Sequence, residues 1–450
     1  MRKDLTTGSL MKNVIMISMP MIAALLLQTA FNIVDAIYVG RLSAEAIAAV
    51  SLAFPIMFFV FAIAGGIGVG ATSLIARYIG AKQVEKADNV AEHALLIGGV
   101  LSITFTILGL LFGKHLVVMM GGGELVELSL SYLNTIFIGT FFLVTFAIAN
   151  SILRGEGDTK TPMMQMIIAT LVNIILDPIF IFGLKMGVKG AAIATVIANI
   201  VGFVIAIYGL TREKSSISIR PKDFKLDFSI VKNIFKIGVP SSLSQVSMSI
   251  SLFVMTRIVS YFGTYAIAAF GISFRLDSIA ILPALGLMMS VIPIVGQNVG
   301  AKKFDRAEKT AYIVATMAAV FTGVVGLIFF AFPRVFISIF NTHTEVINYG
   351  VTYLRIVPLA YAFIGIGISM SGAFLGAGDP IPALITTLLR VIILVIPLAL
   401  IFAFVLNMGI NGIWLAYAIS ICISGTTSLL WFRSGGWKKR NIKKLDMPTA

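Results

Sequence analysis

Long apolar stretches alternate with short polar connections along the whole chain. A helix needs about 20 predominantly apolar residues to cross the hydrocarbon core of a bilayer, and each stretch meets or exceeds that length. The connections are rich in Gly, Pro, Lys and Asp, which end helices and form turns. The pattern predicts twelve membrane-spanning helices, at residues 13–38, 46–75, 90–112, 129–151, 163–183, 190–210, 231–260, 266–296, 310–332, 348–373, 381–405 and 409–432.

The composition supports the same interpretation. Of the 450 residues, 58% are hydrophobic and 12% are charged, and the mean hydropathy is +1.00. A soluble domain carries about 25% charged residues, and a soluble globule could not hide so much apolar surface. We therefore expect an all-α polytopic membrane protein.

Lysine and arginine lie mostly on one side of the predicted membrane. With the N-terminus in the cytoplasm, the two tails and the connections on that side hold 24 of the 34 basic residues. Cytoplasmic segments of membrane proteins carry such an excess, so both termini are predicted to be cytoplasmic in a cell (inner or plasma) membrane. The net charge of +14 then reflects topology and contact with anionic lipid, and no nucleic-acid partner is expected.

Few residues are suited to catalysis or to a bound transition metal. The single cysteine, Cys422, excludes an internal disulfide and a cysteine metal cluster. The three histidines lack metal-ligand spacing, and no phosphate-binding loop of the ATPase type occurs. We expect neither enzyme activity nor a resident cofactor.

The second half of the chain repeats the first at an offset of about 220 residues. Each half holds six predicted helices, an even number, so the two halves enter the membrane in the same orientation. Parallel repeats of this kind build transporters in which two bundles, related by a pseudo-two-fold axis along the membrane normal, enclose a central cavity. The matching motifs begin at Ser9 and Ser229, Pro20 and Pro240, Ala46 and Ala266, Ile79 and Val299, Gly155 and Gly376, and Gly187 and Gly409.

The repeat divides the chain into five parts. They are a cytoplasmic N-terminal tail (1–12), an N-lobe (13–210), a cytoplasmic linker (211–230), a C-lobe (231–432) and a basic cytoplasmic tail (433–450).

Two of the matching motifs, Gly-x-Gly-Asp at Gly155 and Gly376, resemble a motif of intramembrane aspartyl proteases. The neighbouring charges and prolines indicate turns between helices instead.

Two aspartates, Asp35 and Asp177, lie inside apolar stretches of the first half. An ionised carboxylate deep in a bilayer costs roughly 2.5–3.5 kcal/mol or more, so it is rarely present without a function. The second half has Met255 opposite Asp35 and Ile396 opposite Asp177. The same fold is therefore expected to pack without the acids, and the pair predicts a site that binds and releases a cation.

The first predicted helix presents a polar face. Gln28, Asn32 and Asp35 are spaced at i, i+4 and i+7 and so share that face. Pro20, near the start of the same helix, leaves a backbone carbonyl without its donor and favours a bend there.

The fifth and sixth helices supply the remaining polar groups. Asn173 and Asp177 are four residues apart on one face, and Thr195 lies a few residues into the next helix, opposite Tyr417 in the second half. Hard oxygen ligands suit Na⁺, and a pair of carboxylates in a low-dielectric site suits a proton. The alternative is that each acid is separately hydrogen-bonded to a neighbouring helix for packing.

Arg275 and Asp277 are charged residues about ten positions into the eighth predicted helix. Because they are two residues apart, they do not face each other, and each needs another partner. The sequence leaves two roles open, which are structural pairing and a role in gating or substrate contact.

These motifs together resemble the multidrug and toxic compound extrusion (MATE) family, and within it the DinF-like branch. The resemblance spans residues 9–435 and rests on Pro20 with Asp35, the Gly80 and Gly300 Gly-Ala-Lys loops, and the segment Asn-Ile-Ile-Leu-Asp-Pro that begins at Asn173. The NorM branch also carries acidic residues in helices 7 and 10, which this chain lacks. A second-lobe cation site at those positions is therefore not expected.

The resemblance implies roles for individual residues. Asp35, Asn173, Asp177 and Thr195 would form a cation site in the first lobe, for H⁺ or for Na⁺ as a transported ion. Gln28, Tyr132, Asn150 and Met166 would line the neighbouring drug cavity, to which we add Asn32 from the polar face of the first helix.

The function implied is secondary active efflux of amphipathic, often cationic, organic compounds in exchange for H⁺ or Na⁺. The expected partners are small drugs or toxic metabolites and the lipid bilayer, with the protein as a monomer. The main alternative is a flippase for lipid-linked precursors from the same superfamily. That function would need a cationic groove for a pyrophosphate head, whereas the deep arginines lie in the second lobe alone. A channel or receptor is a more distant alternative.

Overall fold

The computed structural model describes residues 4–212, 215–219 and 224–446, and in that part of the chain all twelve predicted spans are helical. Parts of the predicted tails (1–3 and 447–450) and linker (213–214 and 220–223) lie outside the described residues. The first half holds α1 (Leu10–Gly40), α2 (Ala44–Gly80), α3 (Val84–Met119), η1 (Gly123–Leu125), α4 (Val126–Glu156), α5 (Lys160–Pro178), η2 (Ile179–Gly183) and α6 (Gly187–Thr211). The second holds α7 (Phe228–Ser260), α8 (Thr264–Gly300), α9 (Phe304–Ala331), α10 (Pro333–Ser338), α11 (Thr344–Ile356), η4 (Val357–Ala360), α12 (Tyr361–Gly376), α13 (Pro380–Leu388), η5 (Leu389–Leu394), α14 (Val395–Leu400), η6 (Ile401–Val405), α15 (Gly409–Arg433) and α16 (Gly436–Asp446).

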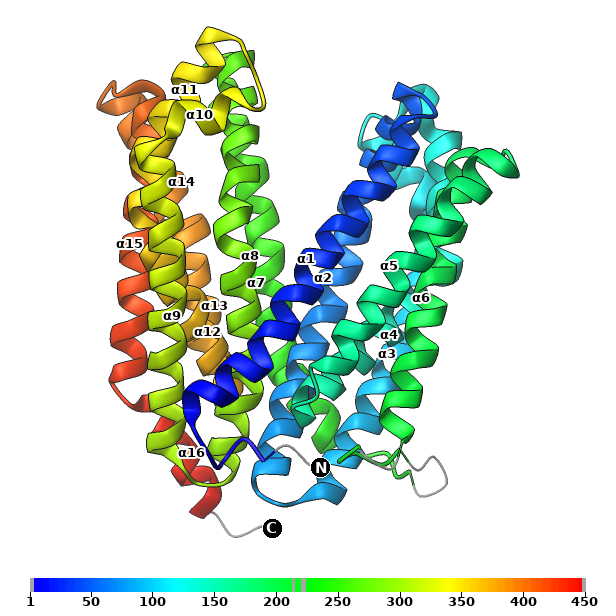
Figure 1. The fold of residues 1–450 in the computed structure, drawn as a ribbon, viewed down its shortest axis with the longest axis vertical. Helices are drawn as coiled ribbons and strands as arrows, with labels where there is room; N and C mark the ends of the chain where they lie inside the picture. Colours follow the sequence, from blue (N-terminus) through cyan, green and yellow to red (C-terminus); the bar gives the residue numbers. More distant parts are fainter. Residues whose placement is uncertain (1–3, 213–214, 220–223, 447–450) are drawn as a thin grey trace. The chain divides into compact units, whose positions relative to one another are not determined.

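The chain forms two compact units, and within each unit the long helices run roughly side by side (Figure 1). The first unit comprises Met1–Leu5 and Met16–Ser242, and the second comprises Thr6–Ile15 and Leu243–Ala450. The division between units therefore falls inside α1 and inside α7. In the first unit α4 packs against α2, α3 and α6, and in the second α12 packs against α8, α9 and α15.

The turns show that the internal repeat is structural. Lys82 and Lys302, which end the two Gly-Ala-Lys motifs, both adopt the left-handed conformation, with φ of 60° and 59°. In each case the next amide donates to a carbonyl five residues earlier, Gln83 N to Tyr78 O at 2.9 Å and Lys303 N to Asn298 O at 2.8 Å. The two halves thus leave the helix through the same turn, which the matching sequence motifs predicted.

Both Gly-x-Gly-Asp motifs also form turns. Gly157 and Gly378 have φ of 87° and 75°, a conformation that favours glycine. In the first turn, Asp158 Oδ1 accepts hydrogen bonds from the amides of Lys160 and Thr161, both at 3.1 Å, at the start of α5. Its Oδ2 accepts from the Thr161 hydroxyl at 2.6 Å and pairs with Arg212 at 2.5 Å. The motif therefore fixes a helix start.

Asp158→Ala is expected to lower the stability of the protein by about 1–2 kcal/mol, since it removes a carboxylate that satisfies unpaired amides at a helix N-terminus. Thermal unfolding in detergent should show a lower midpoint than the parent. Arg212→Ala serves as the comparison. It removes a partly exposed ion pair, worth about 0–1 kcal/mol, and a hydrogen bond of 2.9 Å to the Thr161 hydroxyl. The amides at the start of α5 keep their acceptor, so this variant should have the smaller effect. Equal midpoints for Asp158→Ala and the parent would contradict the assigned role.

The connection between the halves is tied to the first unit. The buried Glu156 carboxylate accepts hydrogen bonds from the Ser215 hydroxyl at 3.0 Å and the Ser216 amide at 2.7 Å. The His93 ring accepts one from the Asp227 amide at 2.8 Å. Polar groups at the ends of α3 and α4 thus position the chain that leads into α7.

Small residues let α2 approach its neighbours closely. A Cβ added at Gly70 would lie 2.5 Å from the Ile234 carbonyl oxygen of α7, and one at Gly66 would lie 2.5 Å from that of Gly238. A Cβ at Gly68 would lie 2.4 Å from the Ser151 hydroxyl of α4. The glycine run therefore serves close helix packing, as expected for small residues between membrane helices.

Candidate functional site

α5 brings Asn173 and Asp177 to one buried face. Both side chains are fully buried, and Asn173 Nδ2 donates a hydrogen bond of 3.0 Å to Asp177 Oδ1. The prediction that they share a face is confirmed. Pro178 follows at once and has no N–H group, and the chain continues as the π-helical segment η2. The carboxylate therefore lies at the point where regular α-helical bonding ends.

Asp35 of α1 lies beside this pair. Its carboxyl is close enough to that of Asp177 for the two to interact electrostatically. The residue is half-buried, and its Oδ1 is buried without a hydrogen-bond partner among the described residues. The tertiary structure thus brings together two acids that are 142 positions apart in the chain.

Tyr132 of α4 lies within electrostatic reach of both Asp35 and Asp177. Its ring packs against two hydrophobic clusters, one around Val39 and Ile181 and the other in the α2–α4 core. Tyr132 is therefore held between the helices that carry the acids. Spacing along the chain did not connect Tyr132 with the aspartates, because it lies on a different helix from both. The family resemblance alone implied a place for it, in the neighbouring drug cavity.

Three oxygen atoms of this cluster are buried and without a hydrogen-bond partner in the described part of the chain: Asp35 Oδ1, Asp177 Oδ2 and Asn173 Oδ1. Leaving a buried acceptor unsatisfied costs about 1–3 kcal/mol, and more for a charged group. A proton or a hard cation would satisfy such acceptors. Within the described residues no group of three or more His, Cys, Asp or Glu side chains forms a metal site, so this acid–amide cluster is the candidate cation site.

The other predicted residues of the first unit are spread over several helices. Thr195 is half-buried on α6, which packs against α5, and its carbonyl accepts a 2.7 Å bond from Asn199 Nδ2. Asn150 of α4 is buried, with its Oδ1 unpartnered among the described residues. The roles predicted for Thr195 in the cation site and for Asn150 in the drug cavity stay predictions. Pro20 is buried within α1, Met166 is half-buried on α5, and Gln28 and Asn32 are exposed on α1.

In the second unit, Asp277 of α8 finds partners that the sequence did not identify. The carboxylate is 8% exposed and accepts hydrogen bonds from two tyrosine hydroxyls, that of Tyr353 to Oδ2 at 2.6 Å and that of Tyr361 to Oδ1. Arg275 is exposed instead. The two charged residues therefore lie in different surroundings, in agreement with the prediction that they do not face each other.

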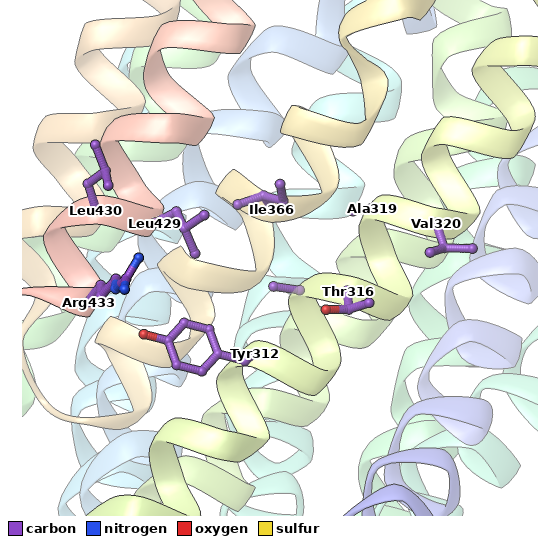
Figure 2. Close-up of a pocket in the computed structure, with 9 residues that line it drawn as sticks. Tyr312, Thr316, Ala319, Val320, Ile366, Leu429, Leu430 and Arg433 are labelled. Atoms are coloured by element: carbon purple, nitrogen blue, oxygen red, sulfur yellow. The ribbon is translucent and has the colours of Figure 1, made fainter.

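A cavity of about 580 Å³ lies in the second unit among α9, α12 and α15 (Figure 2). Its lining is largely apolar, with Ile366 from α12 and Leu429 from α15, and Tyr312 and Arg433 add polar groups. None of the predicted site residues lines it, so it is distinct from the acid cluster.

Comparisons with known proteins agree with this geometry. The MatE family model matches residues 20–179 and 240–401, one match in each half. The chain is 27% identical to the "Probable multidrug resistance protein YoeA" of Bacillus subtilis over 95% of this chain and 94% of that one. It is 28% identical to the "FAD transporter" of Shewanella oneidensis over 94% of each. A crystal structure of MATE in the bent conformation superposes with a TM-score of 0.92 at 33% identity, covering 97% of this chain and 98% of that chain.

Proposed function

Because this chain belongs to the MatE family of multidrug and toxic compound extrusion transporters, we propose that it exports amphipathic, often cationic, organic compounds in exchange for H⁺ or Na⁺. The observation that carries the proposal is the cluster of buried oxygen atoms on Asp35, Asn173 and Asp177 that have no hydrogen-bond partner among the described residues. The ion is a transported substrate of this site. The twelve helices long and apolar enough to span a membrane, together with its bacterial relatives, identify the chain as a multi-pass plasma membrane protein.

The acid pair provides a means of coupling. An antiporter requires that cation and substrate favour opposite states or compete for one site, because a ligand shifts a conformational equilibrium only through its differential affinity. We propose that drug binds while Asp35 and Asp177 are ionised. Entry of H⁺ or Na⁺ then lowers the negative charge of the pair, α1 bends at Pro20, and the drug leaves.

The basic residues on one side of the spans support a topology with both termini in the cytoplasm. In that orientation the Gly-Ala-Lys turns and the connection at 211–230 are also cytoplasmic. Export against a concentration gradient would then draw on the ion gradient across the plasma membrane.

The substrate class needs two probes. The name of the Bacillus subtilis relative refers to multidrug resistance, and that of the Shewanella oneidensis relative refers to FAD, an aromatic anion. An organic cation and a flavin therefore test two different chemistries. The acid cluster favours the cation, because carboxylates that bind a positive ion also attract a positive substrate when the ion has left.

Transport in proteoliposomes tests the proposal. The purified protein is reconstituted, and uptake of ethidium and of FAD is followed while a pH gradient and a sodium gradient are imposed separately. We expect one of the two gradients to drive ethidium accumulation beyond equilibrium, with liposomes lacking the protein as the control. Equilibration of both probes without accumulation under either gradient would refute secondary active export. Accumulation of FAD alone would overturn the preference for cations.

A further inference from the structure

The Asp277 carboxylate links α8 to both sides of an interruption in the tenth membrane span. α11 ends at Ile356, the next four residues form the 3₁₀ segment η4, and α12 begins at Tyr361. Tyr353 lies before the interruption and Tyr361 directly after it, and each donates its hydroxyl to Asp277. Pro358, inside η4, has no N–H group to continue the helix. One side chain therefore holds the two halves of a broken helix against α8.

Among the described residues, the Asp277 carboxylate forms no ion pair. The groups that act on it are tyrosines from three elements, Tyr353 (α11), Tyr361 (α12) and Tyr417 (α15). From η5, Arg390 acts on Tyr417. The negative charge is thus stabilised by hydroxyl donors rather than by a neighbouring cation.

The cluster is also tightly packed. From α9, the Thr322 hydroxyl donates to the Tyr361 carbonyl at 2.8 Å. The buried Trp414 of α15 packs edge-on against Tyr353, with ring centroids 5.0 Å apart, and stacks with Phe270 of α8 at 5.9 Å. A change in the hydrogen bonds of Asp277 would therefore move Tyr353 and alter the surroundings of the Trp414 indole ring, which packs against it.

Protonation would change the bonding in a defined way. As an anion, Asp277 accepts a hydrogen bond at each oxygen. A hydronium ion transfers a proton to one of these oxygens, so that one O–H bond of the donor breaks as the carboxyl O–H bond forms and water is released. The charge of the side chain rises from −1 to zero. That oxygen then carries a donor and, as a neutral group, accepts a hydrogen bond less strongly. The tyrosine bonded to it is therefore held more weakly and is free to rotate away. As the pH falls from neutral, the tyrosine hydroxyls stay neutral and Arg390 stays charged, so Asp277 is the member of this cluster whose charge can change.

We propose that Asp277, with Tyr353 and Tyr361, is a proton-binding site of the second unit, and that protonation loosens the tie between α8 and the interrupted span. The site lies outside the acid cluster of Asp35 and Asp177. Asp277 lies on α8, and not on the seventh or tenth helix, where the NorM branch carries its second-lobe acidic residues. It gives the second half of the chain a proton-responsive group of its own, independent of which ion the first unit transports.

Trp414 provides a readout that does not require transport. Tryptophan emission of the purified full-length protein is recorded as the pH is varied. We expect a pH-dependent change that is absent from Asp277→Asn and from Trp414→Phe and is retained in Asp35→Asn and Asp177→Asn. A change that persists in Asp277→Asn, or that is missing from the parent protein, would overturn the proposal. If the fluorescence change is lost in Asp177→Asn, it originates in the first unit, and the proposal is overturned as well.

Tyr361→Phe gives a second test should Asp277→Asn fail to fold. It keeps the ring, which packs edge-on against Phe329, and removes one donor to the carboxylate. Because the anion loses a stabilising bond, protonation should occur at higher pH, and the midpoint of the Trp414 signal should rise by about one pH unit. An unchanged midpoint would refute the site. Failure of the first unit to couple transport to an ion would leave both fluorescence results unaffected.

Discussion

Asp177→Asn is expected to abolish ion-driven export while leaving a folded protein in the membrane. The asparagine keeps the shape of the side chain and still offers an oxygen to Asn173 Nδ2, so the buried hydrogen bond of α5 is retained. What is lost is a charge that a cation can neutralise. Coupling free energies are typically about 1–3 kcal/mol, which corresponds to roughly 5- to 150-fold. We expect the gradient-driven flux of ethidium in proteoliposomes to fall by at least the upper end of that range, about 150-fold.

The matched control is Asp305→Asn. It makes the same chemical change at a side chain that is 92% exposed at the start of α9, and it should transport at the parent rate. Binding of ethidium without a gradient, measured by fluorescence anisotropy, separates lost coupling from lost binding. Asp35→Asn should behave as Asp177→Asn does, because the two carboxyls interact. Parent-like flux in both acid variants would show that the pair is a packing feature.

Gly70→Val should be the most damaging substitution for folding. The first carbon of the new side chain would already lie 2.5 Å from the Ile234 carbonyl oxygen, and the obstacle is backbone rather than a movable side chain. α2 would have to move away from the start of α7, with loss of the close packing around Ile234 and Gly238. Overpacking of a well-packed interior costs about 1–3 kcal/mol and occasionally more, and we expect this variant to lie at the upper end. Detergent-solubilised yield and the thermal unfolding midpoint provide the measurement.

Gly271→Ala is the matched control for that substitution. Gly271 lies inside α8, and a Cβ added there would meet nothing within 4 Å. Alanine is about 1 kcal/mol more favourable than glycine in a helix interior, so stability should stay the same or rise. A parent-like unfolding midpoint for Gly70→Val would contradict the proposed need for glycine at the α2–α7 contact. So would a midpoint for Gly271→Ala that is lowered as far as that of Gly70→Val.

Much of the candidate site followed from local spacing. Asn173 and Asp177 are four residues apart, which in any α-helix places them on one face, and the structure shows them hydrogen-bonded. The same rule separated Arg275 from Asp277. Such predictions succeed because they depend on the geometry of a single helix, which is fixed by its backbone hydrogen bonds.

Contacts between helices were harder to predict from the sequence. Tyr132 beside the two acids depends on how α4 packs against its neighbours. The tyrosine partners of Asp277 depend on an interruption at η4 that breaks the helical period between Tyr353 and Tyr361. Nor did the pattern of apolar residues distinguish π from α segments in the eleventh span, since both are equally apolar there.

The sequence by itself determined the twelve spans, the twofold repeat with its matching turns, and the candidate acids, because each follows from hydrophobicity, short-range spacing or turn chemistry read along one stretch of chain. Only the tertiary structure decided which side chains meet. It joined Asp35 to Asp177 and gave Asp277 its two tyrosines. The physical reason is that every span is apolar on nearly all sides, so hydrophobicity drives each helix into the membrane without selecting the neighbour it packs against. That selection is made by close-fitting small residues and by polar side chains on different helices, whose positions in the chain do not reveal their contacts.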